Sequence, residues 1–244
     1  MIDTSIFQGK KASYYTLGCK LNFSETSTFG RMLHDLGVQT TQKGEVADLC
    51  IINTCSVTDV ADHKCRQIIN RLVRNNPGAF VVVTGCYAQL EPERISKIKG
   101  VDLVLGSNEK ASLMQFLSDA WIDKESKKAE SGDDNNSLHR YYTVKTKDIK
   151  SFAPSCSRGN RTRYFLKVQD GCDYFCTYCT IPLARGIARS DEMENVLKNA
   201  YEISKQNIKE IVLTGVNIGD YGKGEFGNKK HEHTFLELVQ ALDK

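Results

Sequence analysis

Three short apolar runs, each followed by a stretch with helical periodicity, constrain the fold more than any other feature of the sequence. The runs are DLCIINT (48–54), AFVVVTG (79–85) and DLVLG (102–106), and ASYYTLG (12–18) is a further strand-like segment. β-branched residues without polar alternation are typical of strands that are buried on both faces. Because such strands alternate here with helical stretches, the sequence predicts an α/β fold with a parallel, helix-covered sheet.

Polar residues at characteristic spacings predict where several helices begin. Asn22 followed by Glu25 predicts the start of a helix, and so does Ser190 before a stretch with an apolar stripe. Thr234 and Glu237 form a capping-box pattern, which predicts the start of the last helix.

A change in composition after residue 122 predicts a second domain. The stretch DKESKKAESGDDNNS holds no aliphatic residue larger than alanine, which is typical of a solvated linker. Strand-like order resumes at RYFLKVQDG (163–171) and again at KEIVLTG (209–215), which reads as a buried strand. Two βα units are too few to close a barrel of about eight strands, so we expect an incomplete barrel or a fragment of one. The predicted division is a domain at 1–122, a linker at 123–157 and a partial domain at 158–244.

Cysteine usage is informative because the chain shows no feature of a secreted or membrane protein. No apolar run reaches the length of a membrane span, and the N-terminus lacks the apolar core of a signal peptide. We therefore expect a cytoplasmic protein without a membrane partner. In a reducing cytosol its nine cysteines are expected to be buried hydrophobes, metal ligands or nucleophiles rather than disulfides. The net charge of +3 permits a nucleic-acid partner without requiring one.

Three cysteines lie close together in GCDYFCTYC, directly after the predicted strand 163–171. Cys172, Cys176 and Cys179 have the spacing C-x3-C-x2-C. Three thiolates on one loop can hold three irons of a cubane cluster and leave the fourth iron open. An open iron can chelate the amino and carboxylate groups of S-adenosylmethionine, whose cleavage is then chemistry of the cofactor. The alternative is a zinc site or a structural cysteine cluster, although zinc usually takes four ligands.

A second set of cysteines is dispersed in sequence, but each member follows a predicted strand. Cys19 follows YYTLG, Cys55 follows IINT and Cys86 follows VVVTG. The carboxyl ends of parallel strands share one edge of a sheet, and open α/β sheets build their sites at that edge. The pattern indicates a second metal site; the alternative is three unrelated small residues near strand ends.

The remaining cysteines suit other roles. Cys50 lies inside a predicted strand, and Cys65 falls on the apolar stripe of a predicted helix. We expect both to be core residues that bind nothing, since free cysteine behaves as a small hydrophobe. Cys156 lies in the predicted linker and is expected to be a free thiol.

The cysteine loop resembles the signature of the radical S-adenosylmethionine superfamily, in which C-x3-C-x2-C follows the first strand of a βα series. TLGCKLN, INTCSVTDVADHKCRQ and VTGCYAQ resemble the N-terminal domain of the methylthiotransferases. The resemblance implies a Rossmann-like N-terminal domain followed by the first part of a radical S-adenosylmethionine TIM-like barrel. The rest of the family's barrel and its small RNA-binding β domain have no counterpart in this sequence.

The resemblance also implies cofactors and their ligands. Two 4Fe-4S clusters are expected, one on Cys172, Cys176 and Cys179, and an auxiliary, sulfur-supplying cluster on the dispersed cysteines. S-adenosylmethionine would lie with its adenine beside Tyr178 and its methionine part against the turn from Gly215 to Asn217. The implied reaction is hydrogen abstraction at the target carbon, insertion of sulfur, and methylation by a second S-adenosylmethionine.

Within the family, TLGCKLN and DVADHKCRQ most resemble the branch that acts on threonylcarbamoyladenosine next to the anticodon of tRNA. The implied partners are the tRNA anticodon loop and an electron donor of the reductase or flavodoxin type, and we expect a monomer. Alternatives are the isopentenyladenosine and ribosomal-protein branches, or a non-catalytic zinc- or cluster-containing RNA-binding module.

Basic residues flank the cysteine loop and suggest a patch for tRNA phosphates, although a solvated surface is an equal alternative. Arg185 or Arg189 would also offer a cation to the carboxylate of a threonylcarbamoyl group. The basic residues are Arg158, Arg161, Arg163, Lys167, Arg185 and Arg189.

Overall fold

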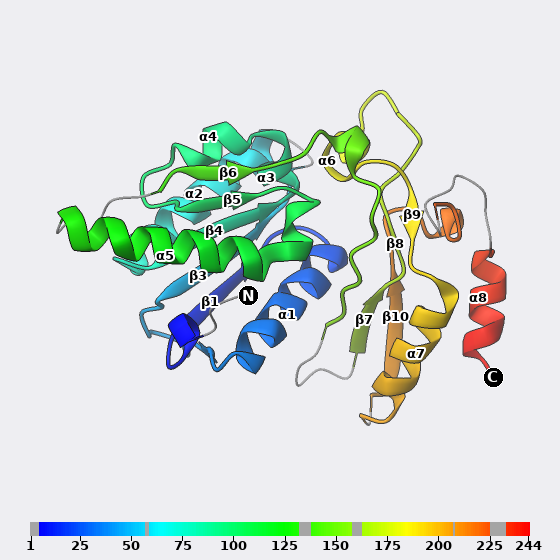
Figure 1. Cartoon of the computed structure of the whole chain (residues 1–244). Helices are drawn as coiled ribbons and strands as arrows, with labels where there is room; N and C mark the ends of the chain where they lie inside the picture. Colours follow the sequence, from blue (N-terminus) through cyan, green and yellow to red (C-terminus); the bar gives the residue numbers. More distant parts are fainter. Residues whose placement is uncertain (1–4, 57–58, 132–137, 158–162, 207, 225–232) are drawn as a thin grey trace. The chain divides into compact units, whose positions relative to one another are not determined.

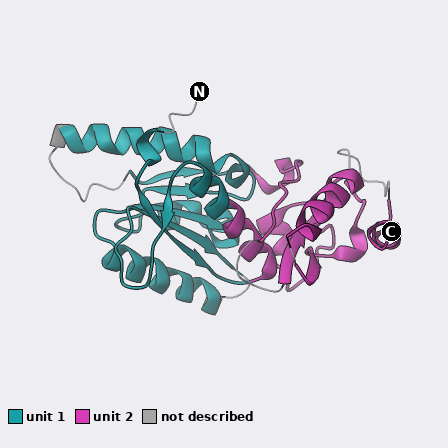
Figure 2. Ribbon diagram, turned by 90° about the horizontal axis from the view of Figure 1, so that it is seen from below, with its two compact units in different colours: residues 1–18, 29–144 teal, residues 19–28, 145–244 magenta. Residues whose placement is uncertain are grey.

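The computed structural model describes the chain in two compact units (Figure 2). Unit 1 comprises residues 1–18 and 29–144, and unit 2 comprises residues 19–28 and 145–244. The structure describes all residues except 1–4, 57–58, 132–137, 158–162, 207 and 225–232.

A six-stranded sheet forms the centre of unit 1 (Figure 1). Every strand pairs in parallel with its neighbours, as the sequence predicts. In spatial order the strands are β2 (Gln39–Thr40), β1 (Lys11–Thr16), β3 (Leu49–Thr54), β4 (Phe80–Gly85), β5 (Leu103–Leu105) and β6 (Arg140–Tyr142).

Helices cover both faces of this sheet because its central strands are apolar on both sides. Every residue of β3 and β4 is buried. Ile51 and Val82 belong to the core on one face, with α1 (Lys20–Asp35) and α5 (Leu113–Ser131). Ile52 and Val83 belong to the core on the other face, with α2 (Asp59–Asn75), α3 (Cys86–Leu90) and α4 (Pro92–Ser96).

The predicted linker 123–157 begins inside ordered structure, which corrects the boundary drawn from composition. Helix α5 continues to Ser131, and β6 adds a strand to the edge of the sheet. The first part of the polar stretch, residues 123–131, holds three lysines and two glutamates, which favour helix, so it extends the helix that precedes it. Polarity alone did not distinguish an exposed helix from a linker.

Unit 2 is built on a short parallel pair of strands and the helix that connects them. β7 (Arg163–Lys167) pairs with β10 (Glu210–Thr214), and α7 (Met193–Ser204) packs Val196, Ala200 and Ile203 against Tyr164 and Leu166. The other elements are the antiparallel pair β8 (Gln169–Asp170) and β9 (Arg189–Ser190), α6 (Ile181–Arg185) and α8 (Phe235–Leu242). Short 3-10 turns lie at Ser5–Phe7, Glu109–Ser112, Thr146–Asp148 and Ile218–Asp220.

The first residues of the observed helices show which of the predicted helix caps form. The capping box of Thr234 and Glu237 is confirmed at α8. Helix α1 already begins at Lys20, so the cap predicted at Asn22 is wrong, and that side chain binds Arg185 instead. The cap predicted at Ser190 is also wrong: Ser190 lies in β9, and Glu192 precedes α7.

The strand predicted at 209–215 forms as β10, but it is only partly buried. Its residues run from exposed at Glu210 to buried at Thr214, because β7 is its only strand neighbour in the described part of unit 2. Among the described helices, none has the length and apolar character needed to cross a membrane.

Candidate functional site

The loop that carries the cysteine triplet connects β8 to α6 and folds back on itself. Cys176 is exposed, Cys172 and Cys179 are half-buried, and all three are free thiols. The backbone N–H of Cys179 donates to the carbonyl of Cys176 at 3.0 Å, and that of Cys176 donates to Tyr174 at 2.9 Å. The loop thus presents three accessible thiols in eight residues of chain, a donor set that suits iron or zinc.

The base of the cysteine loop is fixed to the segment after α6. The N–H of Cys172 donates to the carbonyl of Gly186 at 3.0 Å. Asp173 accepts a hydrogen bond from the N–H of Ala188 at 2.8 Å and an ion pair from Lys223 at 2.8 Å. Gly171 has a φ of +70°, and a Cβ there would collide with the carbonyl oxygen of Ile187. Glycine is therefore required where the chain enters the loop.

Gln169 joins this base to the turn after β10. Its side chain is fully buried; Oε1 accepts from the N–H groups of Val216 and Asn217 at 2.8 and 2.9 Å. Its Nε2 donates to the carbonyls of Asp170 and Gly171 at 3.0 and 2.8 Å. The turn from residue 215 to 217, predicted to meet S-adenosylmethionine, is therefore hydrogen-bonded to the residue two positions before Gly171. Neither the motif nor its spacing singled out Gln169; its position at a strand end beside a glycine-rich loop was the available signal.

Aromatic side chains on the cysteine loop are unusually exposed. Tyr178, predicted to lie beside adenine, is 88% exposed, and its role stays a prediction. Tyr174, which the sequence did not single out, donates from its hydroxyl to Asp220 at 3.4 Å and lies under the ammonium of Lys223. Exposed rings beside free thiols are available to stack on a planar ligand.

Two of the dispersed cysteines lie at the same edge of the sheet in unit 1. Cys55 directly follows β3 and Cys86 directly follows β4, and the last residues of these strands, Thr54 and Gly85, pair in register. Cys86 is buried as the first residue of α3, and Cys55 is half-buried.

Cys19 follows β1 by three residues, directly precedes α1 and is the first residue of the segment 19–28 that belongs to unit 2. Its exposed thiol lies 3.8 Å from Oδ1 of Asn22. Within the described residues, no three His, Cys, Asp or Glu side chains gather as a metal site, so the ligand sets remain predictions.

Cys50 and Cys65 are buried core residues, as the sequence predicts. Both side chains are 1% exposed and pack in the same core beside β3. Burial raises the pKa of the Cys50 thiol to about 12 and also raises the pKa of Cys65. Thiols held in the protonated form are poor metal ligands and nucleophiles. Cys156, predicted to be free, is a half-buried free thiol.

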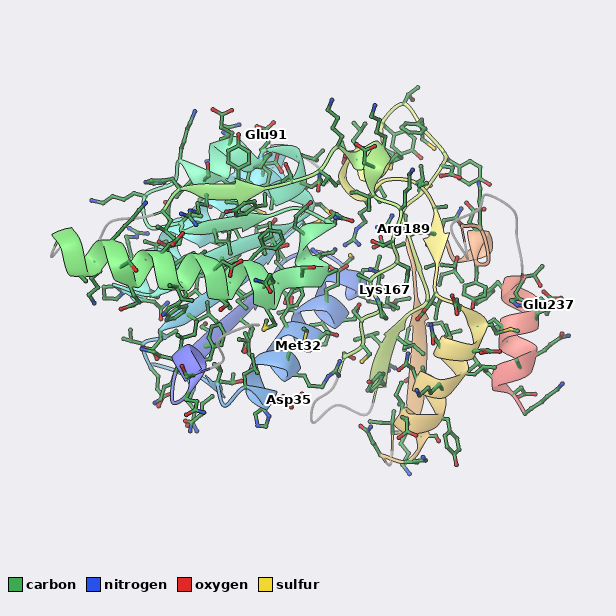
Figure 3. All side chains as sticks on the ribbon, viewed as in Figure 1. Met32, Asp35, Glu91, Lys167, Arg189 and Glu237 are labelled. Carbon is green, nitrogen blue, oxygen red and sulfur yellow. The ribbon has the colours of Figure 1, made fainter. Side chains whose placement is uncertain are left out.

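Three of the basic residues near the cysteine loop are not available for the predicted phosphate patch. Lys167, Arg185 and Arg189 are buried and engaged by carboxylates (Figure 3 labels Lys167 and Arg189). The prediction that Arg185 or Arg189 offers a cation to the substrate is likewise wrong for the described structure, because both side chains are buried and already pair with carboxylates. Arg163 is exposed and pairs with Glu210 at 2.6 Å, whereas Arg158 and Arg161 lie outside the described residues.

A hollow of about 1060 Å³ lies in unit 1, away from the cysteines. It is lined by exposed polar and basic residues of α2, such as Lys64 and Arg71, and by Pro77 and Gly78, just before β4. It therefore lies toward the amino ends of the strands, opposite the edge that Cys55 and Cys86 follow, and it is not part of the candidate site.

Comparison with known proteins finds relatives that are similar over nearly the whole chain. Residues 11–106 match the profile described as "Uncharacterized protein family UPF0004". Over 95% of its length the chain is 37% identical to the threonylcarbamoyladenosine tRNA methylthiotransferase MtaB of Bacillus subtilis (strain 168). Over 87% it is 36% identical to the MtaB of Aquifex aeolicus (strain VF5). The chain is thus similar, over nearly its whole length, to members of the methylthiotransferase family. It spans 48% and 49% of those two relatives, about half of their length.

The chain also resembles a second branch of these enzymes and one solved structure. It is 30% identical over 96% of its length to a tRNA-2-methylthio-N(6)-dimethylallyladenosine synthase of Fusobacterium nucleatum, of which it covers 51%. The radical S-adenosylmethionine methyltransferase TsrM of Kitasatospora setae shares the fold, with a TM-score of 0.52 and 14% identity, over 86% of this chain and 48% of that one.

Proposed function

We propose that this chain is the cofactor-carrying part of a radical S-adenosylmethionine tRNA methylthiotransferase. The proposed reaction adds a methylthio group to carbon 2 of N6-threonylcarbamoyladenosine beside the anticodon. The observation that carries the proposal is the similarity, at 34–37% identity, to four enzymes named for that nucleoside, in a chain whose cysteine triplet lies on one accessible loop.

In this proposal the triplet Cys172, Cys176 and Cys179 holds a 4Fe-4S cluster with one open iron. The three thiols are free and accessible, which suits that role, and the loop offers no fourth cysteine. When bound, the cluster supplies the electron that cleaves S-adenosylmethionine. The protein's part is to place the cofactor: Tyr178 offers a ring for adenine, and the turn of Gly215 and Asn217 offers close backbone approach, since Gln169 holds it beside the loop base.

The second cluster of the proposal lies on Cys19, Cys55 and Cys86 and supplies sulfur. Its support is that each cysteine follows a strand of one parallel sheet, where α/β sheets build their sites. The tRNA anticodon loop as substrate, an electron donor of the reductase or flavodoxin type, a monomeric state and a cytoplasmic location complete the proposal.

Nucleoside analysis tests the proposed substrate. The complete enzyme would be given tRNAs that bear either threonylcarbamoyladenosine or isopentenyladenosine. The tRNAs would then be digested, and the nucleosides would be separated and their masses measured by mass spectrometry. We expect the methylthio mass increment on the former. Product from the isopentenyl substrate alone would place the enzyme with the 30%-identical dimethylallyladenosine branch, and product from neither would favour the ribosomal-protein branch.

Metal analysis tests the proposed cofactors separately. After anaerobic reconstitution, we expect about four irons per cysteine set and brown protein, as iron–sulfur ligation by thiolates requires. Colourless protein with stoichiometric zinc would support a non-catalytic RNA-binding module instead.

A further inference from the structure

A buried network of charged side chains lies beneath the cysteine loop of unit 2. Its members are each at most 3% exposed. Three are cations and two are carboxylates, and the buried carboxylate of Asp191 also interacts electrostatically with Lys167. The members are Glu25, Lys167, Asp170, Arg185 and Arg189, together with the amide side chain of Asn22.

Asp170 connects the network to the cysteine loop. Its Oδ1 accepts from Arg185 Nη1 at 2.9 Å and from the backbone N–H of Gly171 at 2.8 Å. Its Oδ2 accepts from Lys167 at 2.7 Å and from Arg189 at 3.3 Å. Asp170 and Gly171 lead directly into Cys172, so the position of this carboxylate sets where the loop begins.

Arg185 connects the same carboxylate to the segment that carries Cys19. While Nη1 binds Asp170, it also lies 3.3 Å from Oε1 of Glu25, and Nη2 donates to Oδ1 of Asn22 at 2.6 Å. That same Oδ1 lies 3.8 Å from the Cys19 thiol. The guanidinium of Arg185 therefore binds two chain segments at once. One of them begins with Cys19 and the other leads into Cys172, and both cysteines are proposed cluster ligands.

Stability alone does not account for so many buried charges. Removing ions from water costs nearly as much as their pairing returns, and apolar replacements of such groups are often as stable. What charged groups add is geometry: the guanidinium of Arg185 donates from two nitrogens in a fixed plane, whereas the ammonium of Lys167, which also contacts Asp170 and Glu25, donates from a single nitrogen without that fixed plane.

We propose that Arg185 is a positioning residue that holds the segment from Cys19 to Glu25 in register with the loop from Asp170 to Cys179. Asn22 transmits this position to Cys19. The inference rests on the proposed function. In that function, sulfur bound near Cys19 must reach the substrate carbon that is activated at the cysteine loop, so the relative position of the two segments matters. Misplacement then affects sulfur insertion more than it affects cleavage of S-adenosylmethionine.

The first test measures position in the metal-free chain by hydrogen exchange. In Arg185→Lys we expect amides of residues 19–28 to exchange at least about tenfold faster, because local opening follows loss of local contacts. Arg163→Lys is the matched control, since Arg163 is exposed and pairs with Glu210, away from residues 19–28 in the sequence. Unchanged exchange at 19–28 would overturn the proposal.

The second test separates positioning from folding in the reconstituted complete enzyme. Asn22→Ala leaves the ion pairs of Arg185 with Asp170 and Glu25 intact. We expect it to form about as much deoxyadenosine as the unchanged enzyme but at least about fivefold less methylthio nucleoside per deoxyadenosine, since small misplacements are costly to chemistry.

Asn22→Asp is the conservative rescue. It keeps an acceptor oxygen for Arg185, so its product ratio should stay near that of the unchanged enzyme. An unaltered ratio in Asn22→Ala, or equal losses in both variants, would contradict positioning through this oxygen. If the unchanged enzyme forms no deoxyadenosine, the proposed function fails, while the exchange experiment still decides the inference.

Discussion

The side-chain oxygen of Gln169 lies 2.9 Å from the backbone nitrogen of Asn217 and accepts its hydrogen bond. Because the amide nitrogen of the same side chain donates to Asp170 and Gly171, one residue fixes both segments proposed to face S-adenosylmethionine. A binding site assembled from loops needs such a rigid support to keep its geometry.

Gln169→Glu tests this support. Glutamate retains the acceptor for Asn217 but loses both donors and places a charged oxygen against two carbonyls. We expect a loss of about 1–3 kcal/mol in the free energy of unfolding and weaker binding of S-adenosylmethionine by the reconstituted protein. Urea unfolding and equilibrium dialysis measure the two effects. Gln206→Glu makes the same chemical change at an exposed position and should alter neither; equal behaviour of both variants would argue against a structural role for Gln169.

Single alanine replacements of Cys172, Cys176 and Cys179 test the cluster loop in the complete enzyme. Each thiol supplies one of only three ligands in the proposal, so none is redundant. We expect deoxyadenosine formation to fall to background in each variant. Cys156→Ala removes a half-buried thiol elsewhere in unit 2 and serves as the control. Retained cleavage in any triplet variant would contradict the radical mechanism.

The double replacement Cys50→Ala and Cys65→Ala tests the assignment of core thiols. Burial raises the pKa of both thiols, so neither supplies a thiolate at neutral pH. We expect the iron content per chain after reconstitution to be unchanged, with some loss of stability from the smaller side chains. A loss of about four irons, the content of one cubane cluster, would show that one of them is a ligand.

Asp191 makes stability depend on pH in an identifiable direction. Burial raises its pKa from 3.8 to about 6, and within the described residues its Oδ2 has no hydrogen-bond donor. The folded state therefore binds more protons than the unfolded state between these values, so the free energy of unfolding falls as pH rises through this window. At neutral pH the shift amounts to a penalty of about 3 kcal/mol, at about 1.4 kcal/mol for each pKa unit.

Asp191→Asn should remove this dependence. Relative to the variant, we expect the unchanged protein to gain up to about 3 kcal/mol between pH 7 and pH 4. Urea unfolding at each pH measures the difference, with exposed Asp119→Asn as the control. A difference that is constant with pH would refute the assignment to Asp191.

Local patterns predicted the sheet of unit 1 and its core cysteines because those patterns arise from local physics. Strands buried on both faces must be apolar throughout, and Cys50 and Cys65 share that apolar setting. The candidate cysteines were predicted from the ends of parallel strands and from one short motif, neither of which requires long-range information, and their role as ligands stays a prediction.

The charged residues could not be placed in this way. Arg185 meets its partners Glu25 and Asn22 across 160 and 163 positions of sequence, so the segment IPLARGIARS gave no sign that its arginines are buried. Composition favoured exposure, as it does for most arginines. The errors at Asn22 and Ser190 have the same origin, since each polar side chain is used by a distant partner instead of its own helix.

The division of helix α1 between the units has a consequence for fragment complementation. Residues 19–28 belong to unit 2, although they precede most of unit 1 in the chain. A polypeptide ending at Val144 therefore keeps Asn22 and Glu25, whereas one beginning at Lys145 retains Lys167, Arg185 and Arg189 with Asp170 as their one remaining network carboxylate. The later fragment lacks the groups that balance its buried cations. We expect a peptide of residues 19–28 supplied in trans to bind this fragment and to favour its folding, because it returns Glu25 and Asn22 to the network.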